Sequence, residues 1–184
     1  IVADVLALYG SQQEAGRVIA DCAADLPLIE GDATLLRQVI HNLVQNALDA
    51  VEGQSGGRVR ISTQLRRDEH GQPRSVRLSV SDNGPGFPEK ILKRAFEPYV
   101  TTKTKGTGLG LPVVKKIADE HGAVVRLSNL APAPHAAPDG TPTASATAIP
   151  SGGAQVSISF SKFASSSHDA AAAPGAAAAP SAPA

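Results

Sequence analysis

The stretch DATLLRQVIHNLVQNALDAVE, residues 32–52, decides the fold. Its apolar residues recur at i, i+3, i+4 and i+7, which predicts one amphipathic helix with Asp32 as its N-cap. Asn42 and Asn46 lie four residues apart in this pattern, so both amides project from one face, about 6 Å apart along the axis. Amide oxygens suit a magnesium ion that also holds phosphate oxygens. The alternative is that both asparagines only decorate the exposed face of the helix.

The hydropathy pattern around this helix predicts an α+β fold. Apolar and polar residues alternate over 59–65 and 76–80, which predicts a hairpin. A second long helix, over 109–121, is predicted to end at Gly122, which can adopt the left-handed conformation of a helix C-cap. The remaining predicted elements are a short helix at 1–9 and strands at 17–22, 124–130 and 156–160. We expect a two-layer α/β sandwich, in which a mixed, mostly antiparallel sheet packs against about three helices.

Composition predicts one folded domain over residues 1–163 and a disordered Ala/Pro-rich tail over 164–184. The segment 131–153 contains no hydrophobic periodicity and is predicted to be a disordered surface insertion. The 17 basic and 17 acidic residues cancel, which disfavours a nucleic-acid partner. The single Cys22 excludes an internal disulfide, and no apolar run approaches the roughly 20 residues of a membrane span. Because methionine is absent, we expect a piece of a longer protein.

Two glycine-containing blocks follow the asparagine pair. Asp82 comes directly after a strand pattern and opens the turn Asp-Asn-Gly-Pro-Gly, so its carboxylate could accept a hydrogen bond from an exocyclic amine such as that of adenine. Residues 106–111, GTGLGL, open a helix whose N-terminus offers unpaired N–H groups to phosphates. Each block has a plain alternative, which is a strand-end turn for the first and a helix-opening loop without ligand for the second.

Residues 96–105, FEPYVTTKTK, are predicted to form a mobile lid between these two blocks. Phe96 and Tyr99 are expected to anchor its base on the core. Lys103 or Lys105 is expected to reach the terminal phosphate as a positive point charge. The alternative is a solvated basic loop.

These blocks in this order resemble the N, G1, F and G2 boxes of the catalytic, ATP-binding domain of sensor histidine kinases. That superfamily also holds gyrase B, Hsp90 and MutL, and its fold is the Bergerat fold. The resemblance runs from about residue 1 to 163. The strings FEPYVTTK, at 96–103, and GTGLGLPVVKKI, at 106–117, most resemble the nitrogen-regulation kinases of the NtrY and NtrB type.

The resemblance implies ATP and Mg²⁺ as ligands and assigns roles residue by residue. It implies that Asn46 ligates magnesium, that Asn42 contacts phosphate or metal-bound water, that Asp82 binds adenine and that Lys103 acts on phosphate. Asn42, Asn46 and Lys103 would be the catalytic set. The remaining nucleotide-binding residues that it implies are Ala50, Gly84, Gly86, Phe96, Tyr99, Thr101, Thr102, Gly106, Thr107, Gly108, Leu109, Gly110 and Leu111. The family's usual Gly-Thr reads Gly153-Ala154 here, so a threonine that supports the aspartate is missing and water is expected to replace it.

The resemblance further implies transfer of the γ-phosphoryl group of ATP to a histidine on a separate dimerisation domain of the same parent protein. None of this chain's five histidines has the expected acceptor context. Implied partners are that domain and a response regulator. The fragment is expected to be a monomer in the cytoplasm without direct membrane contact. The parent is expected to be a homodimer, and an anchor in the inner membrane is left open for it. Rival functions are an ATPase clamp, a serine kinase of the anti-sigma type and a nucleotide sensor without transfer. Clamp relatives place a glutamate, which deprotonates water, where Asn42 stands. Because an amide cannot act as this base, hydrolysis of ATP by this chain is expected to be slow.

Overall fold

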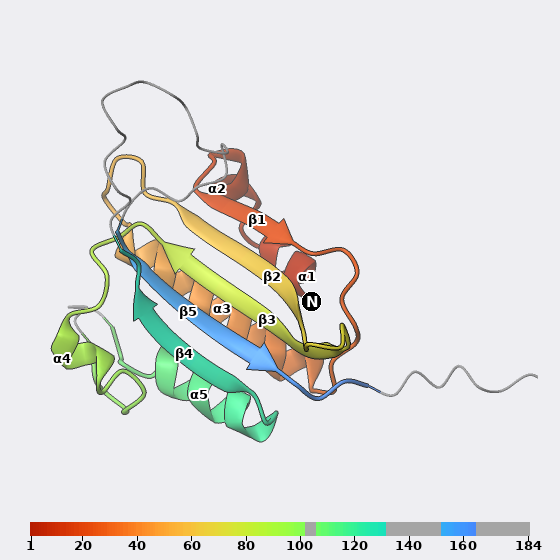
Figure 1. Ribbon diagram of the computed structural model, residues 1–184. Coiled ribbons are helices and arrows are strands. Elements are labelled where there is room, and N and C mark those ends of the chain that lie inside the picture. The colour runs from red at the N-terminus through yellow and green to blue at the C-terminus, as the bar shows by residue number, and fades with distance from the viewer. Residues whose placement is uncertain (102–105, 132–151, 165–184) are drawn as a thin grey trace, which may run out of the picture.

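The computed structural model describes residues 1–101, 106–131 and 152–164. Its centre is a five-stranded sheet in the order β1-β2-β3-β5-β4 (Figure 1). The strands are β1 (Val18–Cys22), β2 (Val59–Arg67), β3 (Pro73–Asp82), β4 (Val124–Asn129) and β5 (Ala154–Phe160). Only the β1–β2 pair is parallel, which confirms the mixed, mostly antiparallel sheet.

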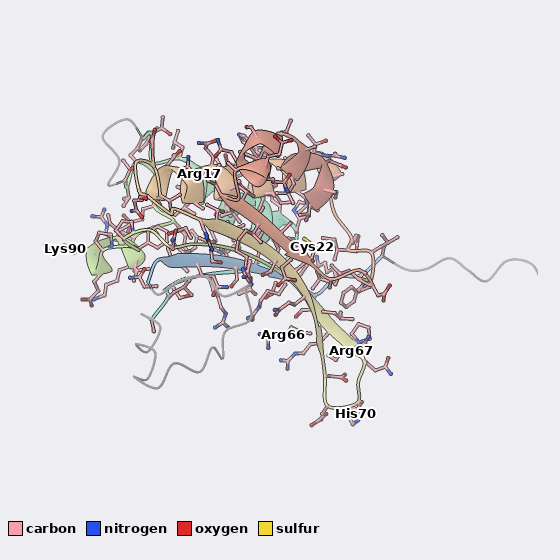
Figure 2. All side chains as sticks on the ribbon, turned by 90° about the horizontal axis from the view of Figure 1, so that it is seen from above. Arg17, Cys22, Arg66, Arg67, His70 and Lys90 are labelled. Atoms are coloured by element: carbon pink, nitrogen blue, oxygen red, sulfur yellow. The ribbon has the colours of Figure 1, made fainter. Side chains whose placement is uncertain are left out.

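Helices α1, α2, α3 and α5 lie on one face of this sheet, with α3 and α5 behind it in the view of Figure 1. The short α4, which carries Lys90, lies beside the sheet, as Figure 2 shows from above. They are α1 (Val2–Ala7), α2 (Gly10–Glu14), α3 (Ala33–Ala50), α4 (Glu89–Leu92) and α5 (Gly110–Glu120). The predicted helices at 1–9, 32–52 and 109–121 are therefore confirmed within a few residues. The short α2 and α4 were not predicted, because five and four residues cannot display a helical period.

Helix α3 forms the centre of the core. Leu43, Val44 and Val39 are at most 1% exposed and pack against the inward residues of the sheet, which include Ile61 and Ile158. The predicted N-cap is confirmed, because Oδ1 of Asp32 accepts hydrogen bonds from the backbone N–H groups of the next turn. The alternation expected for a sheet covered on one face is complete in β5, where every second residue is buried.

The C-terminal end of α5 is tied to the N-terminal end of α3. His121, at the C-cap of α5, accepts a hydrogen bond at Nε2 from Asp32 N, 3.0 Å away, and its Nδ1 lies 2.7 Å from the Ile117 carbonyl oxygen. Gly122 then adopts φ +62°, the left-handed C-cap that the sequence predicts. This histidine therefore joins α5 to the first turn of α3.

The predicted domain end lies where the chain makes its last described contacts. Phe163 forms an isolated bridge with Ile29, and Ala164 N donates to Leu28 O. The predicted tail lies almost entirely in 165–184, outside the described residues, and so does most of the predicted insertion, 132–151. Gly153, at the end of that insertion, belongs to the fold, since its carbonyl accepts from Leu130 N.

Candidate functional site

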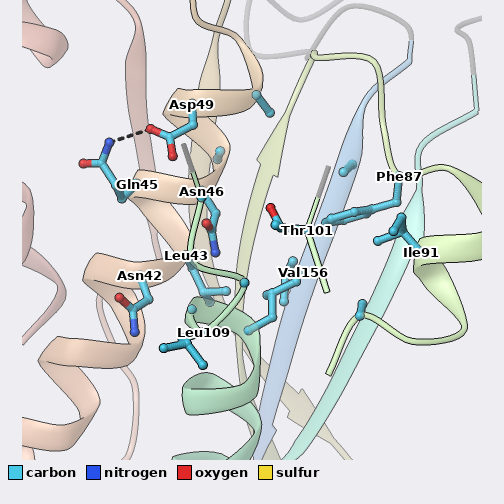
Figure 3. A pocket seen from close by; sticks show the side chains of 18 of the residues that line it. Asn42, Leu43, Gln45, Asn46, Asp49, Phe87, Ile91, Thr101, Leu109 and Val156 are labelled. Atoms are coloured by element: carbon cyan, nitrogen blue, oxygen red, sulfur yellow. Dashed lines mark hydrogen bonds between the residues drawn. The ribbon is translucent and has the colours of Figure 1, made fainter. Parts of the chain in front are cut away.

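A pocket of about 600 Å³ opens beside α3, and its size suits a nucleotide-sized ligand. Figure 3 shows α3 on one side of it, with Phe87 and Ile91 on the other. Its walls come from α3, the end of β3, the turn that follows, α4, the start of α5 and β5. The lining residues that the sequence predicted are Asn42, Asn46, Ala50, Asp82, Gly86, Thr101, Gly106, Thr107, Gly108, Leu109, Gly110 and Leu111.

Helix α3 supplies the polar wall. Its buried face carries Leu43 and Ala47, and the neighbouring face turns Asn42 and Asn46 toward the pocket (Figure 3). Asn46 also faces the start of α5, since a Cβ added to Gly110 would lie 3.2 Å from its Nδ2. The asparagine pair is therefore not surface decoration, because both residues line one cavity.

Asp82 is 5% exposed and lies where β3 ends, as predicted. Its Oδ1 accepts hydrogen bonds from Gly84 N at 2.9 Å and from Ala154 N at 3.3 Å. A backbone N–H of β5 therefore bonds directly to this carboxylate, while the expectation that water replaces the missing threonine stays a prediction. Two donors on one oxygen fix the orientation of the carboxylate.

The turn after Asp82 is held against its neighbours. Asn83 accepts from Arg58 N at 2.6 Å and donates to Gly56 O at 3.0 Å, so its amide ties the turn to the loop before β2. Gly84 lies close to α3, because a Cβ there would be 2.8 Å from Ala50 O. Gly84 itself is not among the residues that line the pocket. Only a glycine at position 84 allows the two backbones to approach this closely.

The glycine block brings the start of α5 to the pocket. Gly108 has φ +68°, and a Cβ there would be 2.7 Å from the Tyr99 carbonyl carbon. Tyr99 N donates to Gly108 O at 3.1 Å, so residues 99 and 108 meet at the stem of the predicted lid. Among the described residues, no side chain caps α5, and the residues of its first turn line the pocket, so its first N–H groups are potential anion donors there.

The predicted anchors of the lid need correction. Tyr99 is 78% exposed and has φ +65°, so it does not pack on the core. Phe96 is half-buried, is outside the core cluster and, like Tyr99, does not line the pocket. The buried residue at this point is Ala95, 2% exposed. A large aromatic side chain was expected to be buried, but Tyr99 is exposed and has a backbone conformation that is uncommon outside glycine. Thr102, Lys103 and Lys105 lie outside the described residues.

Several lining residues were not predicted. Gln38, Gln45 and Asp49 share the polar side of α3 with the two asparagines, and Gln45 Nε2 donates to Asp49 Oδ1 at 2.7 Å. Their spacing of three, four and seven residues from Asn42 and Asn46 could have identified them. The apolar wall could not be found this way, because its members come from separate segments: Phe87, Ile91, Val100, Ala154 and Val156.

The donor set fits a magnesium ion that is held mainly by its substrate. The pocket offers the side-chain oxygens of Asn42, Asn46 and Asp49, all of the hard type that magnesium prefers. Among the described residues, no group of three or more His, Cys, Asp or Glu side chains is placed to hold a metal by itself. Phosphate oxygens would therefore have to complete the coordination.

The opposite side of α3 has a structural histidine. His41 stacks on Tyr9, with ring centroids 5.9 Å apart, and its Nδ1 lies 2.8 Å from the Tyr9 hydroxyl. Burial and the nearby Asp49 carboxylate raise the pKa of Tyr9.

Within the ranges that the structure describes, no helix has the length and apolarity needed to cross a membrane.

Comparison with known proteins agrees with this geometry. An NtrY-like sensor histidine kinase of Rickettsia conorii is 38% identical over 98 residues, which are 53% of this chain and 15% of that protein. The sensory histidine kinase/phosphatase NtrB of Rhodobacter capsulatus is 40% identical over 119 residues, 61% of this chain and 33% of that protein. The chain thus spans a third or less of these relatives.

Solved structures show the same fold. The nucleotide-free catalytic domain of histidine kinase ThkA is 27% identical, with a TM-score of 0.63, and the match covers 88% of this chain and 91% of that one. Full-length ShkA in complex with AMPPNP, 23% identical with a TM-score of 0.61, shares the fold over 89% of this chain and 30% of that one. The family described as histidine kinase-, DNA gyrase B-, and HSP90-like ATPase matches residues 31–163. With the pocket and its glycine-opened helix described above, this chain is a member of that ATPase family, of the type found in sensor histidine kinases.

Proposed function

We propose that this domain binds Mg-ATP and presents its γ-phosphoryl group to a histidine on another domain of a parent sensor kinase. The observation that carries the proposal is one pocket that joins a buried carboxylate, an asparagine pair and an uncapped helix N-terminus. These three features suit, in turn, a purine base, a divalent cation and a phosphate chain.

At the base end, Asp82 accepts a hydrogen bond from the exocyclic amine of adenine. Its orientation is set before binding by Gly84 N and Ala154 N, which reduces the entropic cost of recognition. Gly86 lets the backbone of the turn approach a flat ring. Adenine therefore binds between the end of β3 and the apolar wall formed by Phe87 and Ile91.

At the phosphate end, Asn46 and Asn42 hold the magnesium ion, directly or through its water, and the N–H groups at the start of α5 receive the phosphates. The ion supplies charge neutralisation for the triphosphate. Thr101, Thr102 and Lys103 are proposed to cover this end, and Lys103 adds a positive charge. Phosphoryl transfer needs mainly this positioning and electrostatic stabilisation from the protein, because the attacking imidazole is itself the nucleophile.

The rival clamp function needs a general base for water. Asn42 occupies the wall of α3 with an amide, which cannot take up a proton at neutral pH. The described ionisable neighbour, Asp49, accepts a hydrogen bond from Gln45. We therefore expect slow hydrolysis and transfer to an acceptor as the main reaction.

The acceptor belongs to a different part of the parent protein. His121 is engaged by Asp32 and Ile117, and His41 by Tyr9, so both have structural roles. The proposed partners are a histidine-bearing dimerisation domain, which would make the parent a homodimer, and a response regulator. The need for ATP places this domain in the cytoplasm.

Mixing the chain with a separately prepared histidine-bearing dimerisation domain and γ-labelled ATP tests this proposal. We expect label on the partner that is lost in acid and retained in base, as a phosphorylated imidazole requires. An acid-stable label would instead indicate a serine kinase. Released phosphate without labelled protein would indicate a clamp.

A further inference from the structure

Asn129, the last residue of β4, is bonded to the turn that forms the base end of the pocket. Its Oδ1 accepts from Phe87 N at 2.8 Å, and its Nδ2 donates to Phe87 O at 2.8 Å. One side-chain amide thus satisfies both backbone groups of a single residue, as a neighbouring β-strand would. Few side chains other than asparagine can do this at such short reach, because one donor and one acceptor must lie side by side.

The preceding residue is shaped to the same side chain. Gly86 has φ +77°, and a Cβ added there would lie 2.9 Å from Asn129 Oδ1. Any larger residue at 86 would both strain the backbone and displace the amide. Gly86 and Asn129 therefore form one fitted contact, although 43 positions separate them in the chain.

Phe87, which Asn129 holds, is itself part of the pocket wall. It lines the cavity across from Asn42 and Asn46, and it packs partly against the hydrophobic core (Figure 3). Its backbone has no strand partner, since the residues on either side of it lie between β3 and α4. The position of this wall thus depends on the amide of Asn129.

We propose that Asn129 is a positioning residue for nucleotide binding, which fixes the Gly86–Phe87 wall against the base. The proposal rests on the nucleotide-binding function proposed above. It assigns Asn129 to the base end alone, because Asn129 contacts neither α3 nor the start of α5 through any hydrogen bond found among the described residues.

Asn83 and Asn129 attach opposite ends of the turn that follows β3. The amide of Asn83 ties the beginning of the same turn to Gly56 and Arg58, which lie toward β2. Asn129 ties the end of the turn to β4, at the opposite edge of the sheet. With only the first attachment, Asp82 would stay in place while Phe87 could move away from the base.

The test compares ADP binding by calorimetry, with excess Mg²⁺ and with EDTA, for the whole chain and three variants. In Asn129→Ala both hydrogen bonds are lost. In Asn129→Asp the size and the acceptor for Phe87 N remain, but a carboxylate cannot donate to Phe87 O. Ser128→Ala, an exposed neighbour on the same strand, is the matched control.

We expect ADP affinity to fall about tenfold in Asn129→Ala and at least as much in Asn129→Asp. A tenfold fall is about the change in affinity that one net hydrogen bond contributes. The loss should be equal with magnesium and with EDTA, and Ser128→Ala should bind as the unchanged chain does. If Asn129→Ala does not fold, Asn129→Asp carries the test.

Two results would overturn the proposal. One is unchanged ADP affinity in both Asn129 variants, and the other is a loss confined to the magnesium condition. A general loss of stability is recognised separately by thermal unfolding without nucleotide. Should the unchanged chain bind no ADP at all, the proposed function fails rather than the role of Asn129.

Discussion

The backbone N–H of Ala154 donates a 3.3 Å hydrogen bond to Oδ1 of Asp82, across the pair of neighbouring strands β3 and β5. The fit is close, because a Cβ on the preceding Gly153, which has φ +111°, would lie 1.9 Å from the Asp82 carbonyl oxygen. The backbone at the start of β5 therefore supports this carboxylate. This bond helps to orient the aspartate although residue 154 is an alanine, which has no side-chain hydroxyl.

Asp82→Asn tests recognition of the base. An amide oxygen can still accept from Gly84 N and Ala154 N, so the fold should be retained. The adjacent NH₂ group, however, would face the exocyclic amine of adenine as a second donor. We expect ATP affinity to fall about hundredfold in a fluorescent-nucleotide titration, from the loss of a charge-assisted bond and the opposition of two donors. Asp21→Asn, an exposed aspartate on β1, is the control, and unchanged binding by Asp82→Asn would remove adenine recognition from this residue.

Asn46→Ala tests the magnesium end. Removal of the amide oxygen should weaken ATP binding about tenfold in magnesium and leave binding in EDTA nearly unchanged, since only the metal-dependent part uses this ligand. Arg37→Ala, at an exposed position of α3 that does not line the pocket, is the control for helix stability. Calorimetry in the two buffers provides the comparison, and an equal loss in both would contradict the assigned role.

The sequence predicted those parts whose pattern repeats within one segment. Helix α3 has five turns of regular apolar spacing, and the strands alternate over several residues, so their positions follow from periodicity. The asparagines, Asp82 and the glycine block could be identified because each depends on its own residue type. The predicted burial of Tyr99 was wrong, because an aromatic residue type does not by itself reveal the exposed position and the φ of +65° that Tyr99 has in the fold. The bond from Asn129 to Phe87 joins distant segments, and no single stretch could indicate it.

Gly108→Ala tests the close contact at the lid stem, with Gly53→Ala as its control. Both glycines have positive φ, +68° and +73°, so both substitutions should lower the free energy of unfolding by about 1 kcal/mol through backbone strain. Only Gly108 has a neighbour in the way, 2.7 Å from the added Cβ, whereas Gly53 has none within 4 Å. We expect at least tenfold weaker ATP binding for Gly108→Ala and unchanged binding for Gly53→Ala, because the first must separate residue 108 from Tyr99. Equal affinities in calorimetry would show that the stem contact does not shape the pocket.

Asp32 gives a prediction for acid stability. Hydrogen bonds from Leu35 N and then Thr34 N hold the pKa of its carboxyl below the ordinary value of 3.8. A carboxyl whose pKa is lower in the folded than in the unfolded state contributes stability above the unfolded pKa, and this contribution disappears as pH falls through the folded value. The contribution should therefore be complete at pH 5 and decline below about pH 4.

The measurement is urea unfolding of the unchanged chain and of Asp32→Asn at intervals from pH 5 to pH 2.5. Asparagine keeps an N-cap acceptor for the same two N–H groups but cannot ionise, so the difference between the two proteins isolates the charge. We expect the difference in urea midpoint to narrow steadily as the pH falls. A constant difference across this range would mean that the cap acts through its hydrogen bonds alone, without any stabilisation from the ionised carboxylate.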